Sequence, residues 1–461
     1  MNNTGLFSEF PEVSAKQWKQ KIQMDLKGAD YNETLVWESL EGIHVKPFYH
    51  QEDIENIPTF SLPKDHQWSI GQSIYAGNEQ KANEEAQEIL KKGVESLVFT
   101  IPNENTDFEI LFSGIDLQKV ETYFNFEFLA LEPIKKLISL LKEKKAKAHL
   151  NIDIIGHLTK DGNWYHNLEK DHKLLTDLVS IGTPGILMIG VDASLYQNAG
   201  ANMVQQLAYA LAHGNEYLNH ITSSAPEEKS FPITFKIAVG GNYFFEIAKI
   251  KALRWLWESL ASEYGVQSDC NILATPSKRN KTLYDYNVNM LRTTSECMSA
   301  VLGGADTVCN LAYDAIYHKE NTFGERIARN QLLLLKEEAY LTEASKCSDG
   351  AYYIEFLTNQ LAEKALALFK QIENTGGFLA SLKKGVIQQK IKESAEKEQH
   401  FFDKGKIILL GTNKYQNPQD RMKDDLELYP FVKQKARKTI IVPIIEKRLA
   451  EASEQKRLND E

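Results

Sequence analysis

The chain has 461 residues, of which 43% are hydrophobic and 25% are charged, and its formal net charge at pH 7 is −10. This balance is ordinary for a globular protein, and the length is enough for one large barrel or for two or three smaller domains. The acidic balance disfavours broad nucleic-acid binding, which requires a basic face, and no run of 18 apolar residues predicts a membrane span.

Two features indicate the cell compartment. Residues 1–11 are polar and carry acids, unlike a secretory signal. The four cysteines show no C-x-x-C spacing, so we expect free thiols of a cytoplasmic protein and neither a disulfide nor a zinc framework. These cysteines are Cys270, Cys297, Cys309 and Cys347.

The chain opens with a predicted N-terminal arm, residues 1–55, that has too few apolar residues to form its own core. Its aromatic anchors are Phe10, Trp18, Tyr31, Trp37, Phe48 and Tyr49. We therefore expect the arm to lie on another surface, either the following domain or a partner chain. Buried aromatic side chains dominate interface energetics, so Trp18, Tyr31 and Trp37 are the predicted partner contacts.

Residues 56–375 alternate short β-rich runs with helical runs. The β-rich runs are apolar and rich in Val, Ile and Phe, which is typical of parallel strands covered on both faces. The predicted strands are 95–101, 107–115, 121–128, 147–155, 185–191, 233–240, 270–276 and 305–312. The predicted helices are 84–93, 132–146, 172–181, 203–220, 244–264, 286–302 and 323–340.

Eight strands alternating with helices predict an α/β fold of the (β/α)8 TIM-barrel class. An open doubly wound sheet is the alternative, because the pattern does not show closure, and the first two connections are too short for ordinary helices. Residues 376–461 predict a helical C-terminal extension, in which residues 433–461 have the composition of a solvated helix.

Generic catalytic and metal motifs are missing from the sequence. It contains no phosphate-binding loop, no H-E-x-x-H and no G-x-S-x-G. His149, His157, His166 and His172 come closest to a cluster, but their spacing fits no standard metal site, so none is predicted.

Polar residues follow several predicted strands, where barrels place their functional groups. They are Asp153, Asp192, Ser194, Asn242 and Asn310. Each residue type also caps helices or satisfies loop backbone, so these positions alone identify no chemistry.

Several segments, in the right order between about residues 20 and 415, resemble the methylmalonyl-CoA mutase family. The resembling segments are Asp25-Leu26-Lys27-Gly28-Ala29-Asp30-Tyr31, Gly241-Asn242-Tyr243-Phe244-Phe245-Glu246, Arg292-Thr293-Thr294-Ser295-Glu296, Glu325-Arg326-Ile327-Ala328-Arg329-Asn330-Gln331 and Asp349-Gly350-Ala351-Tyr352-Tyr353-Ile354-Glu355. The resemblance implies a barrel whose axis admits the CoA chain of an acyl-CoA, with adenosylcobalamin as the cofactor of the whole enzyme. It also implies paired subunits, one catalytic and one inactive, in many bacteria.

The departures from the family pattern indicate which subunit this is. Where the catalytic chains carry adjacent tyrosine and histidine, this sequence has Ser194 and Leu195, although Gln197 and the following Ala-Gly-Ala are kept. That histidine would hydrogen-bond the thioester carbonyl of the substrate, and leucine has no donor or acceptor. The resemblance also aligns the radical-side tyrosine with Ser73, or with Tyr75 if two residues are inserted.

Other positions retain only weak similarity to a substrate site. The arginine for CoA phosphate aligns with Pro232, which has no donor, just before Thr234. The resemblance leaves no catalytic residue, since Ser73, Ser194 and Leu195 are degenerate. It leaves Tyr75, Gln197, Thr234 and Asn242 as weak candidates for substrate binding.

No Asp-x-His-x-x-Gly cobalt-ligand motif occurs, so we expect no cobalamin-binding, flavodoxin-like domain and no cofactor on this chain. The resemblance favours a non-catalytic small subunit that pairs with, and stabilises, a catalytic alpha subunit holding adenosylcobalamin. One alternative is an active acyl-CoA mutase subunit that works with a separate cobalamin-binding chain. A regulatory or binding module is the other.

Overall fold

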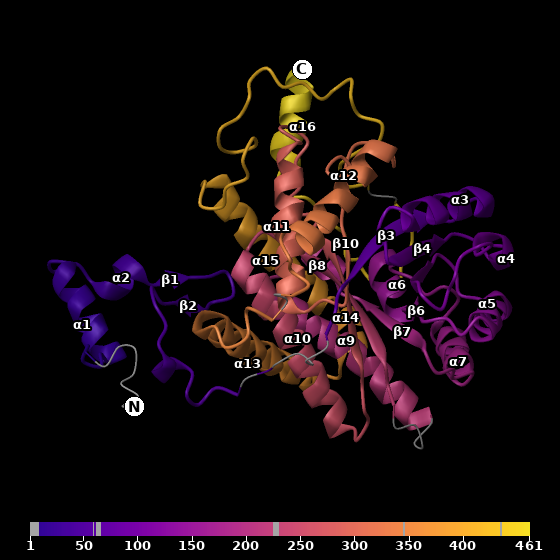
Figure 1. Ribbon diagram of the computed structural model, residues 1–461, viewed down its shortest axis with the longest axis horizontal. Coiled ribbons are helices and arrows are strands. Elements are labelled where there is room, and N and C mark those ends of the chain that lie inside the picture. Colours follow the sequence, from indigo (N-terminus) through magenta and orange to yellow (C-terminus); the bar gives the residue numbers. More distant parts are fainter. Residues whose placement is uncertain (1–8, 59, 61–65, 225–229, 344–345, 434–435) are drawn as a thin grey trace, which may run out of the picture.

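The computed structural model describes residues 9–58, 60, 66–224, 230–343, 346–433 and 436–461. Its centre is a closed barrel of eight parallel strands in the order β10-β3-β4-β5-β6-β7-β8-β9, with an arm projecting to one side (Figure 1). The barrel strands are β3 (Ser69–Tyr75), β4 (Ser96–Ile101), β5 (Glu121–Phe126), β6 (Ala148–Ile152), β7 (Ile186–Asp192), β8 (Ile233–Val239), β9 (Cys270–Pro276) and β10 (Thr307–Cys309). The predicted TIM-barrel class is confirmed, and within the described residues no flavodoxin-like sheet lies beside the barrel.

The predicted strand at 107–115 is wrong. Residues Phe108–Leu111 form the short helix α4, because Asp107 caps its first backbone N–H groups with its side chain. The strand that completes the barrel is β3, which alternates polar and apolar residues and therefore has no continuous apolar run. This exchange also explains the short connections, since β4 and β5 are joined through α4.

Helices surround the barrel and continue beyond it. Those of the barrel region are α3 (Glu79–Leu90), α4 (Phe108–Leu111), α5 (Leu131–Glu143), α6 (Ile154–Asp161), α7 (Leu168–Val179), α8 (Ser194–Asn198), α9 (Met203–Ser224), α10 (Tyr243–Glu263), α11 (Val288–Gly303), α12 (Thr322–Leu333) with the π-turn Leu334–Glu338, and α13 (Tyr352–Asn374). None of the helices in the described part of the chain is long and apolar enough to cross a membrane.

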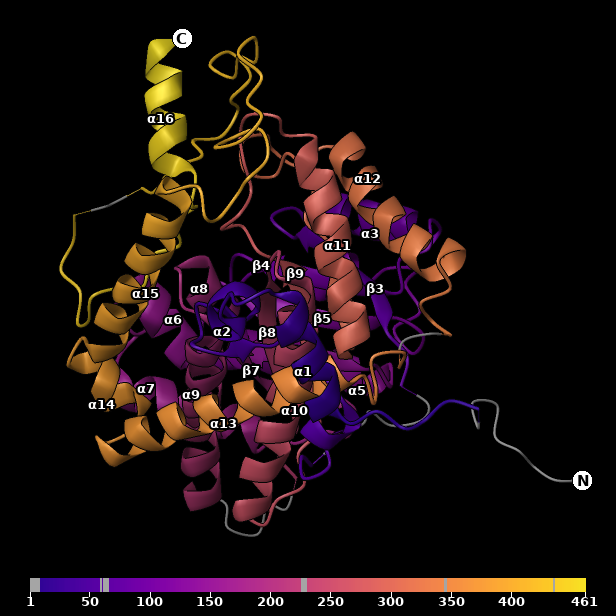
Figure 2. The same ribbon diagram turned by 90° about the vertical axis from the view of Figure 1, so that its left-hand side faces the viewer.

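The C-terminal segment is only partly helical. It contains α14 (Phe378–Lys383), α15 (Val386–Asp403) and α16 (Glu451–Asp460), which follow one side of the molecule in Figure 2. The described residues between α15 and α16 form no helix, and residues 440–449 run as an extended strap along the barrel. Backbone N–H groups of Ile441 and Ile444 donate to the carbonyls of Gly162 and Thr159 beside α6. The expectation of one solvated helix over 433–461 is wrong. Backbone N–H groups of the strap donate to the barrel and not to carbonyls within a helix.

Apolar side chains pack in two layers. The main core lies between the strands and the helices and extends from Ile43 in the arm to Ile444 in the strap. A separate cluster lies inside the barrel, on the opposite face of the strands, and consists of Val98, Tyr123, Leu273 and Cys309. The alternation of side chains along each strand produces these two layers.

The arm has an inner and an outer part. Its inner part is α2 (Tyr31–Leu35), the antiparallel pair β1 (Trp37–Glu38) and β2 (His44–Val45), and a 3-10 turn at Gln51–Asp53. Its outer part is α1 (Ala15–Asp25), in which no residue is buried and which stands away from the barrel in Figure 1.

Candidate functional site

A cavity of about 590 Å3 opens at the carboxyl ends of the barrel strands. Five successive strands contribute polar side chains to it: Thr100, Asn125, Asn151, Asp192 and Lys236. This is the face at which TIM-barrel proteins build their sites, so the cavity, here called the mouth cavity, is the candidate site.

Asp153 anchors one wall of the mouth cavity. Its carboxylate accepts hydrogen bonds from the backbone N–H of Gly156 (2.7 Å) and of Asp192 (2.8 Å), from His213 Nε2 (2.8 Å) and from the Tyr217 hydroxyl (2.6 Å). Burial alone would raise the pKa of this carboxyl, but the imidazole of His213 and these donors outweigh burial and lower it. Asp153 is thus fixed as a carboxylate whose oxygens are occupied by this chain.

Asp192 and Lys236 form an ion pair on the neighbouring strands β7 and β8. Lys236 Nζ lies 3.1 Å from Asp192 Oδ2, and the Ser194 hydroxyl donates to the other carboxylate oxygen. The carboxylate of Asp192 raises the pKa of Lys236, while burial opposes this; in turn Lys236 and Ser194 outweigh burial and lower the pKa of Asp192. Both groups are therefore charged at neutral pH.

Leu195 lines the mouth cavity, and Ser194 lies next to it without lining the cavity. Leu195 is buried. Ser194 is also buried, and its hydroxyl is committed to Asp192. Neither position presents a free hydrogen-bond donor to the cavity.

Below the mouth cavity, two rings stack inside the barrel. The Tyr123 ring stacks on the His149 ring with centroids 4.1 Å apart. The imidazole also contacts Thr234 Oγ1 (2.7 Å) and Glu121 Oε1 (2.8 Å). Ser73 faces the same interior, where its hydroxyl lies 3.3 Å from Cys309 Sγ.

The weak candidates for substrate binding are not brought together. Thr234 lines the mouth cavity, but Tyr75, Gln197 and Asn242 do not. Gln197 is buried in a separate network, where Lys249 Nζ donates to it at 2.9 Å and it donates to Glu246 at 3.3 Å. Tyr75 is 52% exposed at the end of β3, and Asn242 precedes α10 without capping it through its side chain.

Of the strand-end residues, the structure gathers Asp153, Asp192 and Ser194 at one wall. Asn310 instead holds α12, since its amide donates to the carbonyl of Ala328 and to Gln331 (both 2.9 Å). Within the part of the chain that the structure describes, no three His, Cys, Asp or Glu side chains are placed to hold a metal ion.

Sequence reasoning missed several mouth residues. Lys236 had a usable signal, because Thr234 and Lys236 are polar residues two apart in the otherwise apolar strand β8 and so share one face. Asn151 had none: its left-handed backbone (φ 43°) and its buried amide, with no hydrogen-bond partner, appear only in the folded chain. His213 and Tyr217 lie on α9, far along the sequence from Asp153.

The predicted partner contacts differ in exposure. Trp18 on α1 is 51% exposed and meets only Phe48 of the arm edge-on among described rings. Trp37 is also 51% exposed, and one edge of its ring packs on Phe245 of α10. Tyr31 is only 6% exposed, so its side chain is already covered within this chain.

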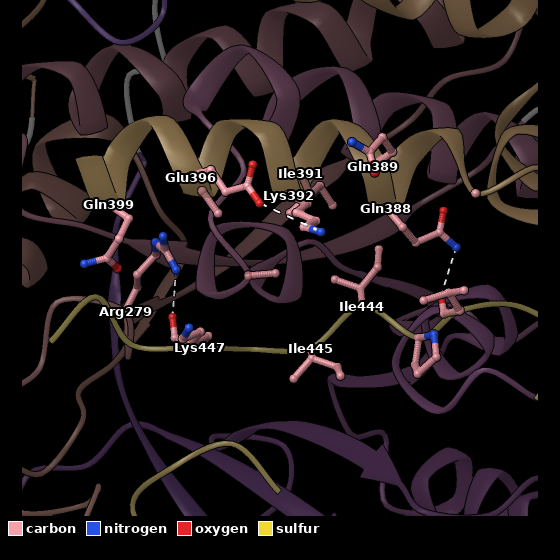
Figure 3. Close-up of a pocket in the computed structure, with 15 residues that line it drawn as sticks. Arg279, Gln388, Gln389, Ile391, Lys392, Glu396, Gln399, Ile444, Ile445 and Lys447 are labelled. Atoms are coloured by element: carbon pink, nitrogen blue, oxygen red, sulfur yellow. Dashed lines mark hydrogen bonds and ion pairs between the residues drawn. The ribbon is translucent and has the colours of Figure 1, made fainter. Parts of the chain in front are cut away.

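A second hollow of about 500 Å3 lies between α15 and the strap (Figure 3). Ile391 of α15 and Ile444 and Ile445 of the strap form its apolar lining. Arg279 closes one end, donating to the Lys447 carbonyl (2.7 Å) and pairing with Glu398. The guanidinium of Arg279 is thus engaged by groups of this chain.

Comparisons with known proteins agree with this architecture. The family model described as methylmalonyl-CoA mutase matches residues 103–459. The methylmalonyl-CoA mutase small subunit of Porphyromonas gingivalis is 37% identical over 440 residues, covering 89% of this chain and 71% of that protein. The small subunit of Streptomyces virginiae is 29% identical, covering 84% and 68%. The methylmalonyl-CoA mutase of Cereibacter sphaeroides is 27% identical, covering 86% and 64%.

The chain spans about two thirds of the length of these curated relatives. The match covers most of the barrel, the mouth cavity and the strap, so the similarity applies to the structure described here. On this sequence match, the chain belongs to the methylmalonyl-CoA mutase family.

Proposed function

We propose that this chain is the non-catalytic small subunit of a heterodimeric, adenosylcobalamin-dependent methylmalonyl-CoA mutase. In this proposal a catalytic alpha subunit interconverts methylmalonyl-CoA and succinyl-CoA, and this chain stabilises it in the cytoplasm. Two relatives similar to this chain are themselves described as small subunits of that enzyme.

The observation that carries the proposal is Leu195 at the mouth cavity. A thioester carbonyl that gains negative charge during a reaction needs a hydrogen-bond donor aimed at it. Leu195 has no donor, and the neighbouring Ser194 hydroxyl donates to Asp192. Position 195 therefore lacks the donor that the family resemblance assigns to the thioester carbonyl.

His213, which lies beside the mouth cavity, has no free ring nitrogen to offer a cobalt ion. Both ring nitrogens of His213 are engaged, with Asp153 (2.8 Å) and the Tyr196 hydroxyl (2.9 Å). His157 lines the cavity with its ring stacked on Tyr165, centroids 3.6 Å apart. The similarity to small subunits supports our assignment of adenosylcobalamin to the partner.

The exposed surface of the arm, with Trp18 in its outer part and Trp37 in its inner part, is the proposed contact with the catalytic subunit. Trp18 and Trp37 each leave half of a large ring exposed, and α1 carries Lys16, Lys19 and Lys21 although the whole chain is acidic. Large aromatic surfaces of this kind contribute most when a partner covers them. Paired barrels related by a pseudo-twofold axis would place the arm of each against the other.

The test is co-expression with the catalytic subunit from the same genome. We expect methylmalonyl-CoA turnover by the pair, no turnover by this chain alone, and co-elution of the two in size-exclusion chromatography. A Ser194→Tyr, Leu195→His variant, which carries the tyrosine and histidine of the catalytic chains, is assayed alone as a control. We expect these two side chains to be insufficient for turnover. Turnover by the unmodified chain with only a separate cobalamin-binding protein would contradict the proposal and favour the active alternative.

A further inference from the structure

The hollow between α15 and the strap is elongated. Its lining on α15 runs along one face of the helix, because most of the contributing positions recur at three- and four-residue spacing from Gln388 to Gln399. At about 1.5 Å of rise per residue, this stretch of helix is roughly 16 Å long. Strap residues 442–445 and Lys447 form the opposite wall. The volume of about 500 Å3 is that of a small-molecule site, and the length favours an extended chain over a compact ring system.

The walls of the hollow are largely apolar. Ile391 and Ile444 are buried, whereas Val442 and Ile445 line the hollow with side chains that are 65% and 42% exposed. Ala199, which follows α8, adds apolar surface from the barrel. Exposed apolar side chains along a groove gain free energy when an apolar chain removes them from water.

Cationic groups lie at one end of the hollow. Figure 3 shows Arg279 and Lys447 together there, with Ile444 and Ile445 farther along the groove. Arg279 is only 7% exposed; its Nε pairs with Glu398 and its Nη1 donates to the Lys447 carbonyl. Among the described residues nothing accepts a hydrogen bond from Arg279 Nη2, and the Lys447 ammonium has no ion pair. Two donors are therefore left for a ligand.

A glycine makes room for the guanidinium at this end. Gly200 has a φ of 101°, and a Cβ at this position would lie 2.8 Å from Arg279 Nη2 and 2.5 Å from the Cβ of Ala395. Glycine adopts this backbone conformation without steric cost and leaves space for both neighbours. The loop after α8 thus lets Arg279 lie directly against its backbone.

The charge of the lining complements a carboxylate. Three cations line the hollow: Arg279, Lys392 and Lys447. One carboxylate lines it, that of Glu396, and it pairs with Lys392 at 3.8 Å. This local excess of cations lies on a chain whose formal net charge is −10. Complementary charge selects an anionic head group, while an acidic chain is repelled by an anionic membrane surface, so a free acid fits better than a bilayer.

We propose that this hollow binds a free medium-chain carboxylate. Its acyl chain lies along Ile391, Ile444 and Ile445, and its carboxylate lies beside Arg279 Nη2 and Lys447 Nζ. Among the described residues, the hollow and the mouth cavity share no lining side chain, so this inference does not depend on the proposed function. The bound acid contacts both α15 and the strap and therefore stabilises the folded chain.

The first test is calorimetric titration of the full chain with decanoate, below the concentration at which decanoate forms micelles. We expect saturable binding of decanoate. Decanol has the same chain without the charge, and acetate has the charge without the chain, so each should bind at least tenfold more weakly.

Two outcomes of this titration would overturn the proposal: no saturable binding of decanoate, or equal binding of decanol. Vesicles of anionic phospholipid are the third probe. Binding to vesicles without binding of decanoate would also overturn the proposal and would make the strap a membrane contact.

The second test uses matched variants on the strap and on α15. Ile445→Glu places a carboxylate on the apolar wall and should weaken decanoate binding at least tenfold. Ile440→Glu, at a strap position that is 60% exposed and outside the lining, should change it less than twofold. Lys447→Gln should weaken binding fivefold or more, whereas Lys390→Gln, on α15 but outside the lining, should not. Equal effects within each pair would contradict the assignment of the site.

Thermal unfolding followed by circular dichroism provides the fold control. Each variant should show a cooperative transition, and decanoate should raise the midpoint of the unmodified chain and of Ile440→Glu but not of Ile445→Glu. Val442→Glu, at a more exposed position of the lining, replaces Ile445→Glu if that variant does not fold. An equal rise in every variant would place decanoate elsewhere on the chain and overturn the proposal.

Discussion

Asp153 and Leu195 line the same cavity and differ completely in what they do. Asp153 accepts four hydrogen bonds from its own chain, so its charge stabilises the fold and is not free for a ligand. Leu195 contributes only apolar surface. A carboxylate at a barrel strand end, usually a sign of chemistry, is here a structural group.

Replacing Asp153 by asparagine should therefore destabilise the fold. Asp153→Asn removes the charge that compensates His213, and we expect a loss of about 3–5 kcal/mol in the free energy of unfolding at pH 7. The folded-state pKa of Asp153 is lowered, so its stabilisation is present above the unfolded value of 3.8 and is lost as the pH falls through the lower folded value. Urea denaturation at pH 7 and in acid checks this; a difference that stays constant with pH would contradict it.

Glu85 on α3 shows the opposite behaviour. Burial, followed by the charges of Glu325, Glu320 and Glu88, raises its pKa from 4.5 to about 7. Between these values the folded chain binds a proton that the unfolded chain has released, so stability falls as the pH rises through this window.

Glu85→Gln should remove that loss. Because Glu85 is partly exposed, we expect a gain of only about 1 kcal/mol at pH 8 and none at pH 4. Thermal unfolding at the two pH values measures it, with Glu84→Gln, an exposed neighbour, as the control. An equal effect of Glu85→Gln at both pH values would refute the assignment.

At the scale of elements, the arm is both a part of this barrel and a projection from it. Ile43 is 1% exposed and belongs to the main core, while Trp37 and Tyr49 pack on Phe245 and Phe356. The outer helix α1 buries no residue. The inner arm therefore stabilises this chain, and the outer arm is left for a partner.

A matched pair of variants separates these two parts. Ile43→Ala should lower the free energy of unfolding by about 2–5 kcal/mol, because it leaves a cavity in the core. Trp18→Ala should change it by less than about 0.5 kcal/mol but weaken association with the catalytic subunit by tenfold or more. Denaturation and co-elution measure the two effects; a Trp18→Ala chain that pairs normally would show that α1 is not the contact.

At the scale of the whole molecule, the strap ties the C-terminal segment to the barrel. Ile441 and Ile444 belong to the main core, and Leu449 N–H donates to the carbonyl of Arg279 after β9 (2.8 Å). Arg448 and Glu454 form a buried ion pair beside this point, with Arg448 also donating to the Lys281 carbonyl (3.0 Å). The segment after α15 is thus a component of the barrel unit.

Ile444→Ala should consequently lower the free energy of unfolding of the main transition by about 2–5 kcal/mol. Val442→Ala, at a strap position that is 65% exposed, should change it by less than about 0.5 kcal/mol. Circular dichroism and tryptophan fluorescence should report the same transition, because Trp68 and Trp257 are buried in this core. A separate, earlier transition confined to the Ile444→Ala variant would show that the strap folds independently.

Several parts of this structure were determined by the sequence itself. The apolar runs of β4, β5, β7, β8 and β9 and the amphipathic helices between them predict a barrel, since both depend on residues close together in the chain. The family-like segments, and the substitution at Leu195, are likewise properties of the sequence alone. Asp153, Asp192 and Ser194 could be named as strand-end residues for the same reason.

Only the tertiary structure decided the rest. β3 has too few consecutive apolar residues to be recognised, and it is a strand because β4 and β10 pair with it on both sides. The strap has no helix because distant carbonyls at Thr159 and Gly162 take its N–H groups. Tyr123 is buried inside the barrel, where Thr307, on a strand far along the chain, contacts its hydroxyl. Each outcome depends on contacts between residues far apart in sequence, which local propensity does not encode.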